Sequence, residues 1–200
     1  MYTSTAGRNF TFSGQLTAAA KSLTFSRLAR FAMILILGTC AAAQTLATIH
    51  DFGAGRDGEN PQSGVIFDRK GNLYGSAALG GATGNGSIYS LTPPAGGQGP
   101  WTESILHQFT GKPDGQTPDS VLTMTQTGNL FGTTQLGGAK NLGSVFAVIP
   151  PAAPGGSWSE RVLYSFGTVP KDGSGPNMGL LAVTGGLIGV TVDAAARCFS

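Results

Sequence analysis

Three near-copies of one five-residue motif divide the chain at a constant interval. The motif reads GNLYG at residues 71–75, GNLFG at residues 128–132 and GGLIG at residues 185–189, so each copy begins 57 residues after the one before. A fixed interval of this kind indicates a repeat architecture, in which each repeat buries its apolar surface against its neighbours. This feature constrains the fold more strongly than any other in the sequence.

The match extends far beyond the motif. Residues 47–103, the first repeat, align without a gap on residues 104–160, the second repeat. The third repeat, residues 161–200, begins in register, slips by one residue at Asp172 and returns to register at its motif. It then stops matching, so we expect about two and a half repeats.

Each repeat has the pattern of four short strands. In the first repeat we expect strands at residues 65–68, 73–77, 87–93 and 101–109, where aromatic and β-branched residues lie between glycine, asparagine and proline turn signals. Four antiparallel strands are the content of one β-propeller blade. The sequence therefore predicts an all-β fold of tandem repeats that form propeller-like blades. A β-solenoid is the alternative, although its turns are usually shorter than this interval.

Residues 1–43 have the pattern of a secretory signal peptide. Basic residues up to Arg30 precede an apolar run, and three alanines then precede Gln44, as in an A-x-A cleavage site. The apolar run is shorter than the roughly 20 residues with which a helix spans a bilayer. We therefore expect a secreted or cell-surface repeat domain at residues 44–200, which meets a membrane only through its leader before cleavage. A retained membrane anchor is the alternative.

The distribution of charge argues against nucleic-acid binding. The chain has 12 basic and 10 acidic residues, and four of the basic residues but none of the acidic ones lie in the predicted leader. The remainder is mildly acidic and has no run of Lys or Arg that could bind phosphates. Of the two cysteines only Cys198 follows the leader, so we expect no internal disulfide.

The combined motifs resemble a known family. The glycine motif, the Leu-Gly-Gly that follows it, the strand GSVF, Pro-Pro, Trp-Ser-Glu, VLYSF and DG-x-x-P are similar to the Gloeo/Verruco (GloVer) tandem repeat over about residues 46–190. That repeat occurs in exported bacterial proteins of the choice-of-anchor type. The resemblance implies an exported, propeller-like repeat protein and gives no activity or cofactor to transfer. This chain departs from the family pattern in its small number of repeats and in having no sorting tail.

Three aspartates at matching positions are candidate binding residues. Asp57, Asp114 and Asp172 each precede a glycine and lie a few residues before a proline. They could form calcium loops or converge at one end of a propeller, but the sequence lacks the alternating acids of an EF-hand loop. We favour a plain turn, in which the aspartate binds its own backbone and the glycine takes a positive φ.

The repeated tryptophans, Trp101 and Trp158, could stack on sugar rings if they are exposed, although packing between blades is the more frequent role. Glu103 and Glu160 follow them at one offset, and paired carboxylates can hydrolyse glycosides. An acid and a base in catalysis require different pKa values. Because the two glutamates lie in similar sequence environments, nothing in the sequence would separate their pKa values. We expect these glutamates to be salt-bridged or solvated.

His50 and His107 occupy equivalent positions, and the third repeat has Tyr164 there. Because a phenol cannot replace an imidazole in catalysis or metal binding, we expect half-buried rings with a structural role. The sequence contains no G-x-S-x-G motif and no P-loop. We expect no metal and no cofactor.

These observations favour a non-enzymatic, exported repeat protein that acts as a surface or adhesion scaffold. The alternative from another class is a carbohydrate-binding or carbohydrate-active propeller that uses the three aspartates and two tryptophans as its binding residues. A third possibility is a truncated piece without independent function, whose open ring is completed by further repeats or by a second copy of the chain.

Overall fold

The computed structural model describes residues 46–53, 57–192 and 198–199. The chain divides into two parts, residues 1–47 and residues 48–200, and the fold described below belongs to the second. The predicted signal peptide lies outside the described residues. In the part of the chain that the structure describes, no helix has the length and apolarity needed to cross a membrane.

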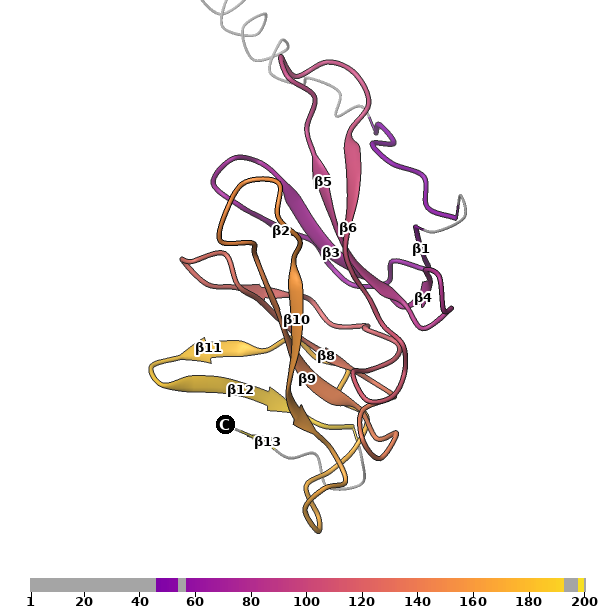
Figure 1. The fold of residues 1–200 in the computed structure, drawn as a ribbon, viewed down its shortest axis with the longest axis vertical. Helices are drawn as coiled ribbons and strands as arrows, with labels where there is room; N and C mark the ends of the chain where they lie inside the picture. The colour runs from indigo at the N-terminus through magenta and orange to yellow at the C-terminus, as the bar shows by residue number, and fades with distance from the viewer. Residues whose placement is uncertain (1–45, 54–56, 193–197, 200) are drawn as a thin grey trace, which may run out of the picture. The chain divides into compact units, whose positions relative to one another are not determined.

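The first repeat forms a four-stranded antiparallel sheet (Figure 1). Its strands follow the order β2-β3-β5-β6 and comprise β2 (Ile66–Phe67), β3 (Leu73–Ala77), β5 (Ser87–Thr92) and β6 (Thr102–Gln108). All four strands predicted from the sequence are present. Two further two-residue strands, β1 (Gly58–Glu59) and β4 (Leu79–Gly80), pair with each other beside this sheet.

The second repeat forms a matching sheet in the order β10-β9-β8-β7. Its strands are β7 (Thr123–Met124), β8 (Leu130–Thr134), β9 (Ser144–Ile149) and β10 (Ser159–Ser165). A single bridge between Gln116 and Leu136 occupies the position of the β1–β4 pair. The second sheet therefore reproduces the first in strand order and in this additional contact.

The third repeat keeps its strand pairing for longer than the sequence match predicts. Its sheet has the order β11-β12-β13 and comprises β11 (Leu181–Val183), β12 (Gly186–Val190) and β13 (Cys198–Phe199). Phe199 lies opposite Gly189 in the β12–β13 register. This is the position that Tyr89 holds opposite Gly75 in the first sheet. The sequence match ends after the third motif, but a backbone pairing equivalent to β3–β5 follows it after a shorter connection.

The two glycines of the repeated motif have different physical roles. Gly71 begins the motif at φ 85°, and its counterparts Gly128 and Gly185 have φ values of 86° and 90°, a region that favours glycine. Gly132 ends the second copy of the motif and lies beneath an aromatic ring, so that a methyl group there would be 2.6 Å from Phe146 Cζ. The first two copies of the motif therefore each combine a tight turn with a close aromatic contact, which Tyr89 makes at Gly75 and Phe146 makes at Gly132.

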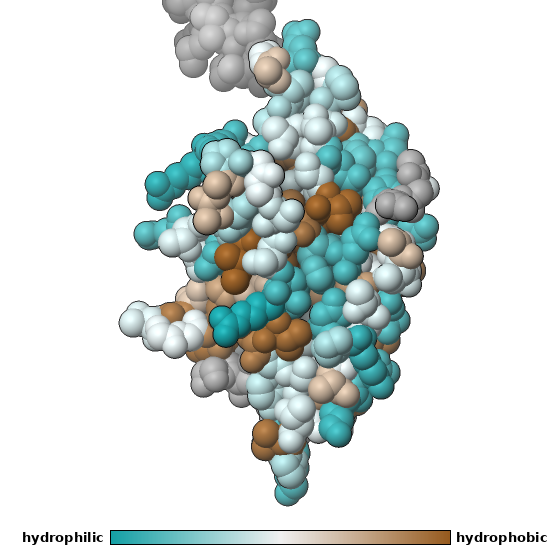
Figure 2. All heavy atoms as spheres, viewed as in Figure 1, coloured by the Kyte–Doolittle hydropathy of each residue, from teal (hydrophilic) through white to brown (hydrophobic). Residues whose placement is uncertain are grey.

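Apolar clusters lie between consecutive sheets. One cluster joins residues of the first repeat, including Tyr74 and Ile88, to residues of the second, including Phe109 and Phe146. The rings of Phe109 and Phe146 are 5.0 Å apart, and both side chains are completely buried. A further cluster joins the second repeat to the third through Phe166 and Leu180. On the face drawn in Figure 2, hydrophobic side chains form separate small patches among hydrophilic ones.

The all-β prediction is confirmed. Each described sheet is antiparallel, and none of them closes on itself into a barrel. Consecutive sheets bury apolar clusters between them, which is the arrangement expected of a repeat whose single sheet cannot cover both of its faces. The comparison with propeller blades is a looser one.

Candidate functional site

Each connection that leads into a sheet is closed by one of the three predicted aspartates. We name these connections joint 1 (residues 50–61, described outside 54–56), joint 2 (residues 107–118) and joint 3 (residues 164–176). The carboxylate accepts a backbone hydrogen bond from Gly53 at 3.2 Å in joint 1, from Thr110 at 3.1 Å in joint 2 and from Gly167 at 2.9 Å in joint 3. The donors are 57 residues apart, and the extra residue of the third repeat is accommodated between Gly167 and Asp172.

The glycine that follows each aspartate is required chiefly for close packing. A methyl group at Gly58 would lie 2.1 Å from Ala77 Cβ, and one at Gly115 would lie 2.6 Å from Thr134 Cγ2. Of the three glycines that directly follow the aspartates, only Gly173 has a positive φ, of 90°. The expectation of a positive φ is therefore wrong for joints 1 and 2, where the glycine lets the joint approach its sheet.

The proline at the end of joints 2 and 3 packs against the preceding repeat. A methyl group at Gly86 would lie 2.5 Å from Pro118 Cδ, and one at Gly143 would lie 2.6 Å from Pro176 Cδ. Both prolines are fully buried. A joint therefore lies between two repeats, with its Asp-Gly pair against the following sheet and its proline against the preceding one.

An aromatic or imidazole ring begins each joint and lies edge-on to a phenylalanine. In joint 2, His107 Nε2 lies 3.1 Å from Asp114 Oδ2 in a hydrogen bond. In joint 3, Tyr164 donates its hydroxyl to Asp172 Oδ2 at 2.6 Å. In joint 1, His50 Nε2 is 3.9 Å from Asp57 Oδ2, which is too far for a hydrogen bond. The exchange of histidine for tyrosine in joint 3 thus preserves the ring-to-carboxylate contact.

Two glutamates complete clusters that sequence reasoning did not assemble. Glu103 joins His50 and Asp57, and Glu160 on β10 joins His107 and Asp114; in each cluster one potential ligand atom from every residue lies within 4.8 Å of the others. Glu103 Oε1 is 3.7 Å from His50 Nε2. The expectation of a salt-bridged or solvated glutamate fails for Glu160, because its Oε1 is buried without a hydrogen-bond partner.

The constant spacing of these residues is the signal that could have revealed the clusters. The histidine precedes the aspartate by seven residues in joints 1 and 2, and the glutamate follows the aspartate by 46 residues in both repeats. The tryptophans drew attention to the glutamates, but nothing in the local sequence places a residue of the last strand beside a joint 46 residues earlier.

The carboxyl groups of the second cluster have pKa values that move in opposite directions. Burial raises the pKa of Glu160 to about 7, and the nearby charge of Asp114 adds to this effect. Burial also acts to raise the pKa of Asp114, but hydrogen bonds from Thr110, Gly115 and His107 lower it overall. The pKa of His107 is lowered by burial, against the opposing effect of Asp114. At neutral pH the cluster therefore combines an ionised aspartate with a glutamate close to its titration point.

The first cluster differs in its balance of charge. Burial raises the pKa of Glu103, His50 acts to lower it and Asp57 acts to raise it. Burial beside Glu103 also raises the pKa of Tyr89 to about 12. Two carboxyl groups and one imidazole therefore share a region that water reaches poorly.

The family assignment follows from a comparison of the whole chain. A family model described as the Gloeobacter/Verrucomicrobia repeat matches residues 36–198. The chain belongs to the Gloeobacter/Verrucomicrobia repeat family. The resemblance seen in the sequence motifs is thereby confirmed. No curated protein matches the chain.

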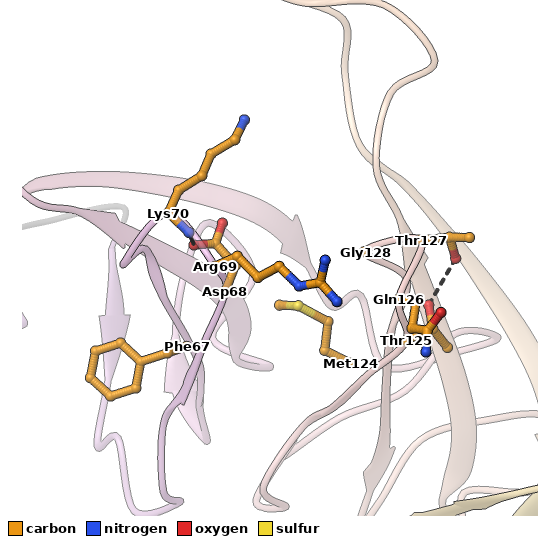
Figure 3. A pocket seen from close by; sticks show the side chains of 9 residues that line it. All are labelled: Phe67, Asp68, Arg69, Lys70, Met124, Thr125, Gln126, Thr127 and Gly128. Carbon is orange, nitrogen blue, oxygen red and sulfur yellow. Dashed lines mark hydrogen bonds between the residues drawn. The ribbon is translucent and has the colours of Figure 1, made fainter.

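An open hollow of about 600 Å³ lies between equivalent turns of the two Gloeobacter/Verrucomicrobia repeats that have complete sheets (Figure 3). The turns are residues 67–70 and residues 124–128. Asp68 shapes the first turn by accepting hydrogen bonds from the backbone of Lys70 and Asn72 at 2.8 and 2.9 Å. Arg69 extends toward the second turn, Phe67 points away from it, and Lys70 points toward the top of the view. Arg69 is therefore the basic side chain that reaches from the first turn into this open hollow.

A second hollow, of about 450 Å³, contains one of the predicted tryptophans. We name it the tryptophan cleft; its lining includes Asn72, Tyr74, Ser90, Thr92, Ser104 and Trp158. The rings of Tyr74 and Trp158 are 6.2 Å apart and belong to different repeats. Trp158 also packs against the apolar cluster that includes Tyr74 and Leu106, as Trp101, its equivalent in the first repeat, packs against the cluster of Leu73, Ala77, Tyr89 and Leu91. Both predicted tryptophans are therefore half-buried against apolar clusters, and Trp158 in addition lines the cleft.

Proposed function

We propose that this Gloeobacter/Verrucomicrobia repeat protein is an exported, non-enzymatic scaffold that binds a ligand outside the cell or at the cell surface. The tryptophan cleft is the observation that carries the proposal. It lies between two repeats, and its lining combines aromatic rings with hydroxyl and amide groups. Such a lining suits a binding site, in which a few polar groups orient a ligand over apolar surface.

The chemistry of the lining favours binding over catalysis. The residues that line the tryptophan cleft include no carboxylate and no imidazole, the groups that most often transfer protons in enzymes. The clusters of titratable residues instead lie in the joints, where their side chains are largely buried. A ligand in the cleft would meet hydrogen-bonding groups, aromatic rings and the aliphatic side chains of Ile105 and Leu106.

Export is supported by the signal-peptide pattern of residues 1–43. Expression of the full chain in a bacterial host, followed by fractionation and N-terminal sequencing, tests this part of the proposal. We expect a product outside the cytoplasm that begins at Gln44. A cytoplasmic product that retains Met1 would contradict export and would leave the binding proposal to be judged separately.

A carbohydrate is the second candidate for the ligand class, and the same cleft favours it. The flat rings of Tyr74 and Trp158 offer stacking surface, while Asn72, Ser90 and Ser104 offer donors and acceptors that suit sugar hydroxyl groups. A glycan-binding scaffold would need no chemistry beyond these contacts.

A glycan array probed with the purified chain tests the carbohydrate proposal. We expect reproducible binding that is lost on Trp158→Ala and retained on Trp101→Ala, because only Trp158 lines the cleft. The pair Thr92→Arg and Gln98→Arg provides a second comparison. Both residues are exposed, but only Thr92 lines the cleft, so only Thr92→Arg should block it.

The array distinguishes three results. Binding that survives both Trp158→Ala and Thr92→Arg would place the glycan elsewhere and would reject the cleft. A blank array would reject a carbohydrate as the ligand. A capture experiment with extracellular proteins would then test the broader scaffold proposal through the same two pairs of variants.

A further inference from the structure

The cluster of His50, Asp57 and Glu103 at joint 1 contains three buried polar atoms that have no hydrogen-bond partner. They are His50 Nε2, Asp57 Oδ1 and Glu103 Oε1. The side chain of Asp57 is only 7% exposed, and those of His50 and Glu103 are 18% and 17% exposed. Buried polar atoms are nearly always satisfied in proteins, so the coincidence of three of them in one cluster calls for a partner.

The charge of this cluster also lacks compensation within the described chain. Asp57 and Glu103 bring two carboxyl groups together. Among the described residues, the basic group nearest to them is His50, whose Nε2 is 3.9 Å from Asp57 Oδ2 and 3.7 Å from Glu103 Oε1. These separations exceed hydrogen-bonding distance. Burying a carboxylate without close pairing is costly, and proteins meet that cost by pairing the charge or by coordinating a metal.

In the other two joints, the ring that begins the joint forms a direct hydrogen bond with the aspartate. In joint 3, Tyr164 and Asp172 form a direct hydrogen bond of 2.6 Å. In joint 2, His107 and Asp114 are joined at 3.1 Å, and Asp114 accepts further hydrogen bonds from Thr110 and Gly115. Joint 1 has the same residue types as joint 2 but leaves its imidazole nitrogen and both carboxyl groups with free acceptor atoms.

We propose that joint 1 binds a divalent transition-metal ion, with His50, Asp57 and Glu103 as its three protein ligands. An imidazole nitrogen and two carboxylate oxygens are donors that Zn²⁺ accepts, and three protein ligands leave one position of a tetrahedral ion for water. Two carboxylates and a neutral imidazole carry a charge that a divalent cation cancels. The imidazole favours Zn²⁺ and its neighbours over Ca²⁺ and Mg²⁺, which prefer oxygen donors.

The observed separations are compatible with such an ion. Ligand atoms bound to tetrahedral zinc at about 2.0–2.1 Å lie about 3.4 Å from one another. The distances of 3.7 and 3.9 Å from His50 Nε2 to the two carboxylates therefore require only small side-chain movements. The second cluster would first have to give up its His107–Asp114 hydrogen bond, so it should bind the ion more weakly.

Bound at this position, the ion would fasten the segment around His50 to the last strand of the first sheet. His50 and Asp57 belong to joint 1, whereas Glu103 lies on β6. In joint 3 a protein hydrogen bond closes the equivalent ring-to-aspartate contact. The metal would thus provide a structural link and add no reaction.

The test uses the full chain, stripped with EDTA and titrated with Zn²⁺ or Ca²⁺ in a calorimeter. We expect one Zn²⁺ per chain, bound more tightly than Ca²⁺, and a rise in Tm when Zn²⁺ is added. The variant His50→Tyr copies the residue that joint 3 carries at this position, so it should fold and lose zinc affinity at least tenfold. The matched control, His107→Tyr, should keep one tight site.

The conservative pair Glu103→Gln and Glu160→Gln repeats the comparison without a change in side-chain size. Glu103→Gln should lose the tight site, and Glu160→Gln should keep it. The proposal is overturned if the wild-type chain binds no Zn²⁺, if Ca²⁺ binds more tightly, or if all variants bind Zn²⁺ equally. Loss of binding in the joint 2 variants alone would also overturn it, because the ion would then occupy the other cluster.

Discussion

The pKa values of two neighbouring acids, Asp114 in joint 2 and Glu160 on β10, are shifted in opposite directions by their surroundings. Asp114 accepts hydrogen bonds from Thr110, Gly115 and His107, which lower its pKa overall. Glu160 lies beside the same aspartate but has a buried oxygen without a partner, and burial raises its pKa to about 7. Two acids a few ångströms apart therefore ionise over different ranges of pH.

Glu160 should make the stability of the chain fall as pH rises from about 4.5 to about 7. Below this window the carboxyl group is protonated in both the folded and the unfolded chain, whereas within it only the folded chain holds the proton. The stabilisation is fully lost once the pH exceeds the folded pKa. We expect Glu160→Gln to increase the free energy of unfolding at pH 8 by about 1 kcal/mol, a value discounted for the solvent that reaches the group.

The measurement is the difference between wild type and Glu160→Gln in urea unfolding at several pH values. His107 acts in the opposite direction, because its lowered pKa makes stability fall as pH drops below its ordinary value, so the wild-type curve alone is insufficient. The lowered pKa of Asp114 affects stability only in more acidic solution. Glu59→Gln, at an exposed position, is the control, and a pH-independent difference for Glu160→Gln would contradict the prediction.

At the scale of the strands, the sequence was sufficient where pattern and turn chemistry agree. The runs at residues 73–77 and 87–93 lie between turn signals in the sequence. They form β3 and β5 with nearly the same bounds. The two-residue strands β1 and β4 were not predicted, because so short a pair has no periodicity to detect. The pairing of β13 was also missed, since its residues do not resemble those of the earlier repeats.

The joint clusters were harder to predict, and the reason is topological. The repeated Asp-Gly pairs of Asp57 and Asp114 predict turns in which the aspartate binds its own backbone. Their contact with Glu103 and Glu160 depends on how the last strand of each sheet passes the joint. That relation is set by sheet order and by packing between repeats, which local pattern does not encode. The replacement of the histidines by Tyr164 predicts a structural role for them. It does not reveal that Tyr164 forms a hydrogen bond with Asp172 in joint 3, whereas His50 in joint 1 forms none with Asp57.

The close aromatic contact at the end of the motif gives a prediction for the second sheet. A methyl group at Gly132 would lie 2.6 Å from Phe146 Cζ and 3.0 Å from Leu122 Cδ2, and Phe146 is completely buried. We expect Gly132→Ala to lower the free energy of unfolding by about 2 kcal/mol through overpacking. The control, Gly186→Ala, has no neighbour within 4 Å and should change stability by less than about 0.5 kcal/mol. Equal effects in chemical denaturation would refute the explanation.

At the scale of the whole repeat domain, the joints couple each sheet to the next. Joints 2 and 3 repeat the same cross-repeat hydrogen bond, from Thr117 to Asn85 at 3.0 Å and from Gly175 to Leu142 at 2.9 Å. Joints 2 and 3 also each place a buried proline against the preceding repeat. In such an array, stability is the sum of contributions within repeats and at the interfaces between nearest neighbours.

This nearest-neighbour coupling predicts a local effect for a joint variant. Pro176→Ala removes part of the contact with Gly143 and should loosen the third sheet while the first sheet is unaffected. Hydrogen exchange measured by mass spectrometry should accelerate in β12 by about tenfold, equivalent to about 1.4 kcal/mol. Exchange in β3 and β5 should not change. An even acceleration over all three sheets would show that the domain opens as one unit.

The constant 57-residue spacing of the joints also bears on how a gene for such a chain can change length. An in-frame loss of residues 58–114 would connect Asp57 directly to Gly115 and would recreate an intact Asp-Gly pair. The His50 ring, the Phe52 ring and the following sheet would meet the same kinds of partner as before. Slippage or unequal recombination between copies would therefore yield shorter or longer chains in which every joint is complete. The number of repeats can then change while the contacts between neighbouring repeats stay the same.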